Sequence, residues 1–228
     1  MRHTIFLLCM LISSAVLNSQ SLVNPAYGLV SHETMTVKVV EFTEDNIKVV
    51  LEVENRAADG YFCVDRNTYL IMPDGNRTGM IRLEGLPYCP DLYRFKRIGE
   101  KLSFSLIFSR PAGNLPAWFD IVEECSDNCF SVYGITPDRE ISTEIERAYE
   151  MAESGMPAEA GTLFRKILAG LKEENHGISG SLYSNIIIMY LREGDENSAR
   201  EWFTRLQGSK VPGVELYVAN LAARGIRW

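Results

Sequence analysis

The spacing of apolar residues changes at Pro137, and this change divides the chain into two unlike parts. Before it, from Thr34 to Ile135, apolar and polar residues alternate, which is the pattern of β-strands with one buried face. After it, apolar residues recur every three or four positions, which is the pattern of amphipathic helices. One type of secondary structure cannot satisfy both periods. We therefore expect an all-β part followed by an all-α part.

Short segments of the first part combine this alternation with the β-branched and aromatic residues typical of strands. The clearest is 102–109, in which Leu102, Phe104, Leu106 and Phe108 share one face. The other segments are residues 35–42, 47–53, 69–72, 80–83, 118–122 and 130–135. Short strands without intervening helices over about 100 residues are typical of a β-sandwich. The sequence therefore predicts an immunoglobulin-like β-sandwich.

The second part contains an internal sequence repeat. The spacing of Gly155, Ala160 and Phe164 recurs in Gly194, Ala199 and Phe203. A glycine ends a helix, an alanine lets two helices approach closely, and an aromatic side chain fills the space between them. This order of residues predicts paired helices, about five in all, which begin at an Asp138 cap.

Residues 139–228 resemble about two and a half tetratricopeptide repeats. In the second repeat the family's signature positions are occupied by Tyr183, Ile186, Tyr190, Gly194, Ala199 and Phe203. The first repeat is degenerate, because Glu144 and Arg147 stand where the family has large apolar residues. The third ends after one helix, which would act as a cap. The resemblance implies a tetratricopeptide-like helical domain that binds another molecule.

The β part, from Phe104 to Gly134, resembles immunoglobulin-like modules of uncharacterised secreted bacterial proteins. That resemblance implies no particular activity. Together the two resemblances predict a β-sandwich domain at 21–136 and a tetratricopeptide-like helical domain at 137–228, and the pattern of the N-terminal residues predicts a signal peptide at 1–20.

Stacked helix pairs present their first helices on a concave face, which suits an extended peptide or a partner helix. The repeat register implies that this groove is lined by Ile145, Tyr149, Glu153, Ser181, Ser184, Ile188, Leu191 and Arg192. The alternative is that the β part, or a second copy of the chain, packs into the groove.

The N-terminus has the features of a secretory signal peptide. Arg2 precedes an apolar run from Ile5 to Leu17, and small and polar residues follow the run. The run is shorter than the roughly 20 residues of a membrane span. We expect cleavage near Ala15 or Gln20. The mature protein would then lack an integral membrane segment and would lie in the periplasm, at the cell surface or outside the cell.

Export would place the remaining cysteines in an oxidising compartment. These are Cys63, Cys89, Cys125 and Cys129, and four cysteines allow three pairings. Cys125 and Cys129 are the local candidate pair, which leaves Cys63 and Cys89 for the other disulfide. A metal site or a thiol redox pair is the rival interpretation. The C-x3-C spacing and the lack of a nearby histidine favour structural disulfides.

Two sequence features were candidates for catalysis. The loop that follows His176 superficially resembles a serine hydrolase site, but no strand precedes it as a nucleophile elbow requires, so we expect a cap and a turn. Carboxylates cluster near the 125–129 cysteines at Asp120, Glu123, Glu124 and Asp127. Adjacent strand residues point to opposite faces. We therefore expect a solvated loop rather than a cation site or an acid–base pair.

An aromatic and basic stretch runs from Tyr88 to Lys101 in an otherwise acidic chain. One interpretation is a contact for a partner or an anionic glycan. The other, which we favour, is a strand edge that lysine and arginine keep soluble.

We predict an exported, non-enzymatic protein-interaction scaffold of the bacterial cell envelope, with no cofactor and no metal. The net charge of −7 and the pI near 5.1 argue against nucleic acid as a partner. An alternative makes the β part a carbohydrate- or surface-polymer-binding domain, through Trp118, Tyr88 or Tyr93, with the helices as a spacer. A third hypothesis is an enzyme with a carboxylate site.

Overall fold

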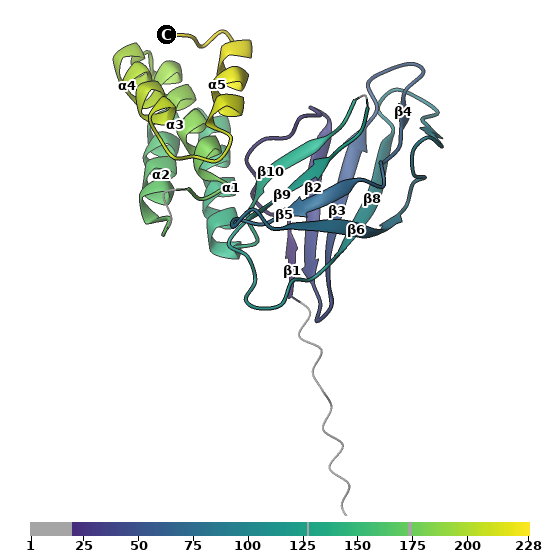
Figure 1. The fold of residues 1–228 in the computed structure, drawn as a ribbon. Helices are drawn as coiled ribbons and strands as arrows, with labels where there is room; N and C mark the ends of the chain where they lie inside the picture. Colours follow the sequence, from purple (N-terminus) through teal and green to yellow (C-terminus); the bar gives the residue numbers. More distant parts are fainter. Residues whose placement is uncertain (1–19, 127, 173–174) are drawn as a thin grey trace, which may run out of the picture.

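The computed structural model describes residues 20–126, 128–172 and 175–228. A curled sheet forms the first part and a stack of helices forms the second, and the two lie side by side (Figure 1). The last strand ends at Ile135 and the first helix begins at Arg139. The change of secondary structure therefore falls at Pro137, as the apolar spacing predicts. The predicted signal peptide, apart from Gln20, lies outside the described residues.

All the predicted strands are present, and β1, β4 and β7 add to them. Eight strands form one sheet in the order β1-β2-β3-β8-β6-β5-β9-β10, with antiparallel neighbours throughout. They are β1 (Gln20–Val23), β2 (Met35–Phe42), β3 (Asn46–Glu54), β5 (Thr68–Ile71), β6 (Arg77–Glu84), β8 (Lys101–Ser109), β9 (Phe119–Glu123) and β10 (Ser131–Ile135). A separate two-stranded ribbon consists of β4 (Tyr61–Phe62) and β7 (Tyr93–Arg94).

The predicted immunoglobulin-like sandwich is wrong, because the strands form one continuous sheet instead of two layers. The cause lies in β6, which belongs to both halves of the sheet. Its first residues, 77–79, pair with β5, and residues from Met80 onward pair with β8. A register shift between Met80 and Arg82 marks a bulge, and bulges bend a strand and increase its twist. The sheet therefore curls into a half-barrel (Figure 1).

The segment after β1 brings the two ends of the sheet together. β1 pairs with β2 at one end of the strand order, but the residues that follow it bond to β10 at the other end. Gly28 N donates to Tyr133 O at 2.7 Å, and Tyr133 N donates to Leu29 O at 2.8 Å. Ala26 O accepts from Thr136 N at 2.8 Å. We call residues 24–31 the bridging segment.

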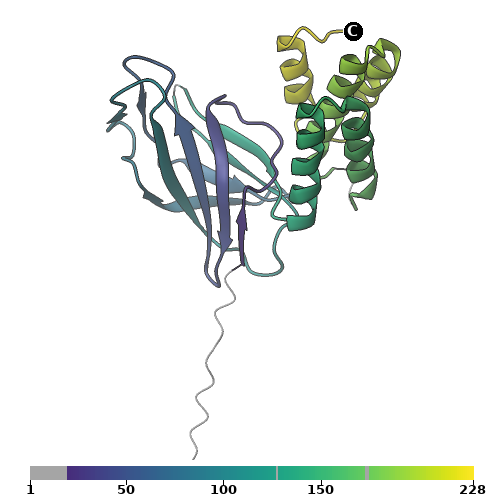
Figure 2. The same ribbon diagram turned by 180° about the vertical axis from the view of Figure 1, so that it is seen from behind.

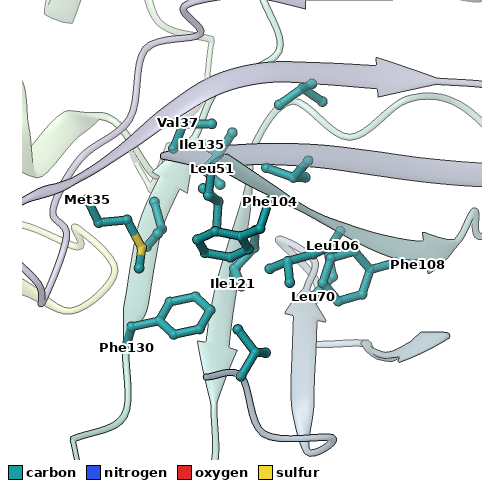
Figure 3. Packing of buried hydrophobic residues seen from close by; sticks show 14 of the residues in the cluster. Met35, Val37, Leu51, Leu70, Phe104, Leu106, Phe108, Ile121, Phe130 and Ile135 are labelled. Carbon is teal, nitrogen blue, oxygen red and sulfur yellow. The ribbon is translucent and has the colours of Figure 1, made fainter. Parts of the chain in front are cut away.

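One apolar core fills the inside of the curl. Leu51, Phe104 and Ile121 come from three strands and meet there, with Phe130 beside them (Figure 3). Phe62 reaches in from the ribbon, and its ring centroid lies 5.5 Å from that of Phe104. Each fully buried side chain of this size contributes about 1.5–3 kcal/mol. The curled sheet thus has a core of its own.

Both disulfides form with the predicted pairing. Cys63 is bonded to Cys89, and Cys125 is bonded to Cys129. The first bond ties the ribbon's two chain segments together, since Cys63 directly follows β4. While all four sulfur atoms are in disulfides, these cysteines offer no thiolate to a metal. Disulfides persist in oxidising compartments.

The described residues of the second part form five helices, as predicted. They are α1 (Arg139–Glu153), α2 (Pro157–Gly170), α3 (Ser179–Glu193), α4 (Glu196–Gln207) and α5 (Val214–Ala223). Asp138 and Asp195 cap α1 and α4, each accepting a hydrogen bond from a backbone N–H of the first turn. The predicted packing residues Ala160 and Phe164 are fully buried, because α2 packs against both α1 and α3.

The helix stack meets the sheet through close backbone contacts. α1 lies beside the sheet, and α2 and α4 lie on the far side (Figures 1 and 2). Tyr217 of α5 is buried between Gly28 and Gly180, and its hydroxyl donates to Gly177 O at 3.2 Å. Gly177 in turn contacts the backbone of Gly134 in β10. We call these four glycines and Tyr217 the glycine junction.

Replacement of Gly180 tests this junction. A Cβ at Gly180 would lie 2.3 Å from Cε2 of Tyr217, whereas a Cβ at Gly170 has nothing within 4 Å. We expect Gly180→Ala to lower the free energy of unfolding by about 1–3 kcal/mol, because the buried ring must move. Gly170→Ala should be neutral or slightly stabilising. Urea denaturation measures both, and equal effects would contradict the close packing.

The two disulfides should differ in their contribution to stability. The Cys63–Cys89 bond closes a longer loop, with a sequence separation of 26 against 4 for Cys125–Cys129. From loop-closure entropy we expect Cys63→Ser/Cys89→Ser to cost about 3.5 kcal/mol and Cys125→Ser/Cys129→Ser about 2 kcal/mol. The urea midpoints of the two double variants show which loss of stability is larger. A larger loss for the Cys125/Cys129 variant would refute the loop-length argument.

Candidate binding cleft beside the first helix

A cavity of about 500 Å³ lies between α1 and the bridging segment. Ligand sites in proteins commonly measure about 300–1,000 Å³. We call it the α1 cleft. It is lined by Asn24, Pro25, Ala26, Tyr27 and Gly28 from the bridging segment and by Ser142, Ile145, Glu146, Tyr149, Glu150 and Glu153 from α1.

The helical period explains why these α1 residues share the cleft. Positions three, four, seven and eight apart lie on one face of a helix. Ser142 fixes the bridging segment to this face, because its Oγ accepts from Ala26 N at 3.0 Å and donates to Asp138 O at 2.7 Å. Ala26 packs in the same buried cluster as Ile145 and Ile178. The bridging segment thus fills part of the face that the helices present to the sheet.

Two tyrosines contribute aromatic surface to the cleft. Tyr149 has 41% of its surface exposed, and its ring meets Phe164 edge-on at 5.4 Å. The hydroxyl of Tyr149 accepts from Asn185 Nδ2 at 2.9 Å, which holds the ring in place. Tyr27 is half-buried, and burial, followed by the nearby Tyr149, raises the pKa of its hydroxyl. The Tyr27 hydroxyl therefore stays neutral at physiological pH.

The rim of the cleft is acidic. Glu146, Glu150 and Glu153 are exposed, and none of them forms an ion pair with a described residue. The last turn of α1 carries no basic residue. Negative charge at a helix C-terminus opposes the helix dipole, and Glu146 and Glu150, four apart, repel each other by about 0.2–0.5 kcal/mol. This arrangement does not favour the stability of α1.

Of the predicted groove residues, Ile145, Tyr149 and Glu153 line the α1 cleft. The remaining ones lie on α3 and do not line it. Ser181 is buried, and Ile188 and Leu191 are half-buried. Ser184 Oγ donates a hydrogen bond to Gly180 O at 2.9 Å. Arg192 Nη1 lies 3.4 Å from Ala152 O. These α3 residues form part of the helix packing or bond to neighbouring backbone.

Sequence reasoning missed Glu146, Glu150 and the bridging segment as parts of the cleft. The glutamates had a signal, because their spacing from Tyr149 and Glu153 places them on or next to the same helix face. The bridging segment had none. Its contact with Ser142 joins residues 116 positions apart, and no local pattern encodes such a pairing.

The carboxylates near the second disulfide do not face one site. Glu123 is buried and accepts from Asp65 N at 2.6 Å and Phe130 N at 3.0 Å. Glu124 lies on the other face and pairs with Arg77 at 2.5 Å. The opposite orientation of these two residues is as predicted, but Glu123 is not solvated, because it bonds to backbone groups of two loops. Asp127 lies outside the described residues.

The two histidines of the described residues serve local structure. His32 Nδ1 lies 3.1 Å from Thr34 Oγ1, and its ring meets Phe62 edge-on. His176 is buried in the connection between α2 and α3, where Nδ1 accepts from Ile178 N at 3.3 Å. The loop after His176 is part of the glycine junction and ends in the first turn of α3.

The aromatic residues proposed for carbohydrate binding are each engaged within the fold. Trp118 is only 4% exposed and lies against Gly177. The guanidinium of Arg66 covers the ring of Tyr88 at 4.0 Å, and Tyr93 donates through its hydroxyl to a carboxylate oxygen of Glu100 at 2.7 Å.

Comparison with known proteins finds no matching family model, no matching curated protein and no matching solved structure. The tetratricopeptide resemblance therefore stays a prediction. No helix in the described part of the chain has the length and apolar character needed to cross a membrane.

Asp120 on β9 is the carboxylate that links the sheet to the glycine junction. Its Oδ1 accepts from Gly134 N at 2.6 Å, at the register shift of β10. Burial raises the pKa of Asp120 to about 6, although the Gly134 N–H partly offsets this rise. Burial raises the pKa of Tyr217, and the negative charge of Asp120 raises it further.

The raised pKa predicts a specific pH dependence. Because the folded state holds the proton more tightly, Asp120 contributes stability that is fully present below its unfolded pKa near 4 and lost as the pH rises through 6. The change is as much as about 3 kcal/mol for a shift of about two units. The difference in unfolding free energy between wild type and Asp120→Asn should fall by this amount between pH 4 and 7.

Urea denaturation across that pH range measures the difference. Glu123, whose pKa burial also raises, is present in both proteins and cancels. A difference that does not change with pH would show that Asp120 titrates normally.

Proposed function

We propose that this chain is an exported, non-enzymatic binding protein of the cell envelope, in which the α1 cleft holds a cationic segment of a partner protein. The proposal is carried by one observation: the α1 cleft gathers three unpaired glutamates, and two of them, Glu150 and Glu153, lie in the last turn of α1, where helix stability favours basic residues. Residues that break a local stability rule without a structural compensation are expected at functional sites.

The composition of the cleft suits a peptide with both charge and apolar surface. Ile145 forms an apolar floor, since only 6% of its surface is exposed, and Tyr27 and Tyr149 form aromatic walls. Lysine and arginine side chains combine an apolar stem with a charged head, and their heads bind both carboxylates and aromatic faces. A basic segment would therefore satisfy the rim and the walls at once.

Export is supported by the two disulfides, which suit an oxidising compartment, and by the signal peptide predicted for residues that lie outside the described part. Binding rather than catalysis is supported by the environment of the titratable groups. Among the described residues, the buried carboxylates Asp120 and Glu123 accept backbone hydrogen bonds, and neither lines the α1 cleft. Their raised pKa values therefore reflect burial within the fold.

Site-specific photocrosslinking tests the proposal. A benzoylphenylalanine at position 149 would be compared with one at position 156, since Tyr149 and Met156 are both 41% exposed. In cells of the source organism we expect a discrete adduct from position 149 that is absent from position 156. Sequencing of the crosslinked peptide should show lysine or arginine beside the attachment point.

Charge reversal supplies the control. Glu146→Lys/Glu150→Lys/Glu153→Lys should abolish the adduct, whereas reversal of the exposed Glu159 and Glu215, which lie outside the cleft, should leave it unchanged. Thermal denaturation would confirm that both variants fold. An adduct that survives reversal of the cleft glutamates, or equal crosslinking at 149 and 156, would refute the proposal.

A further inference from the structure

A second cavity, of about 700 Å³, is lined entirely by residues of the second part of the chain. It lies between the C-terminal half of α2, the first turns of α3 and the C-terminal end of α4. We call it the α2–α4 cavity. None of its lining residues also lines the α1 cleft. An inference about this cavity therefore does not rest on the proposed function.

Basic side chains surround this cavity in a chain of net charge −7. Arg165, Lys172, Arg205 and Lys210 all line it. Arg205 pairs with Glu201 at 2.5 Å. The guanidinium of Arg165, in contrast, donates to two neutral groups, Thr162 Oγ1 at 2.8 Å and the Tyr190 hydroxyl. Neutral acceptors fix the position of Arg165 without cancelling its charge, which leaves it available to an anion.

An aromatic wall stands next to these charges. The rings of Tyr183 on α3 and Trp202 on α4 lie 5.7 Å apart, both half-buried, and both line the cavity. The guanidinium carbon of Arg205 lies over the Trp202 ring, 4.7 Å from its centroid, so a positive charge is held against one face of this ring. Ligand sites typically combine such an apolar wall with a few charged groups that orient the ligand.

We propose that the α2–α4 cavity binds a small organic anion with a flat or cyclic apolar body. The carboxylate or phosphate of the ligand would lie between Arg165 and Lys172, and its body would lie against Tyr183 and Trp202. An inorganic anion fits this surface less well, because it leaves the aromatic wall exposed to water. A neutral aromatic compound offers no negative charge to Arg165 and Lys172. The residues named for this site all lie in the described part of the chain.

Titration by nuclear magnetic resonance provides the test, with 1-naphthoate as the probe. The chain has three tryptophans, and their indole N–H signals report separately on the cavity, on the buried Trp118 and on the C-terminal Trp228. We expect a saturable shift of the Trp202 signal, assigned with Trp202→Phe, while the Trp118 signal stays in place. The neutral analogue 1-naphthamide and the small anion acetate should each bind at least about tenfold more weakly.

A matched pair of double variants locates the anion. Arg165→Gln/Lys172→Gln should raise the Kd for 1-naphthoate at least about tenfold, because it removes two charged donors. Arg147→Gln/Lys166→Gln removes the same charge from α1 and α2 outside the cavity and should change the Kd less than about twofold.

The comparison of 1-naphthoate with 1-naphthamide uses the wild-type protein, so it stands even if a variant fails to fold. Equal affinity for the two compounds, or equal weakening by the two double variants, would overturn the proposal. Shifts of Trp118 without a shift of Trp202 would also overturn it.

Discussion

The contact between Gly177 and Gly134 determines how the two parts of this protein meet. A Cβ at Gly134 would lie 2.3 Å from Gly177 O, so the chain between α2 and α3 approaches β10 at backbone distance. This approach allows Tyr217 to reach across from α5 and donate to Gly177 O, and it places the bridging segment against α1. The α1 cleft exists because the sheet and the helices are held at this separation.

The helix stack carries opposite charges on its two faces. Positions on α1 that face the bridging segment include three glutamates. The α2–α4 cavity is instead lined by one arginine from each of α2 and α4 and by Lys172 and Lys210, which follow these helices. Helical periodicity alone separates residues into faces, but it does not decide what covers each face. Here the bridging segment covers part of the acidic face through Ala26, and the aromatic wall of Tyr183 and Trp202 lies beside the basic residues. The two proposed sites therefore differ in both charge and ligand.

The prediction from sequence succeeded wherever a local pattern carried the information. The alternation in 102–109, the caps at Asp138 and Asp195, and the glycines after α1 and α3 appear in the structure as predicted. The prediction of a sandwich was wrong because the alternation of apolar and polar residues identifies strands but does not show which strands pair with each other. The bulge at Met80 bends β6, so that this one strand pairs with β5 at its start and with β8 further along. The strands that would have formed two separate layers are therefore joined in one sheet.

The amino-acid sequence by itself determined the position of the change from strands to helices, the helix ends and the acidic face of α1, because each depends on residues a few positions apart. Proximity along the chain also favoured Cys125–Cys129 and left Cys63 for Cys89. Only the tertiary structure decided that the sheet curls into a half-barrel and that Ala26 bonds to Ser142. These features join residues far apart in the chain. They are stabilised by packing and backbone hydrogen bonds, which the local spacing of apolar residues does not reveal.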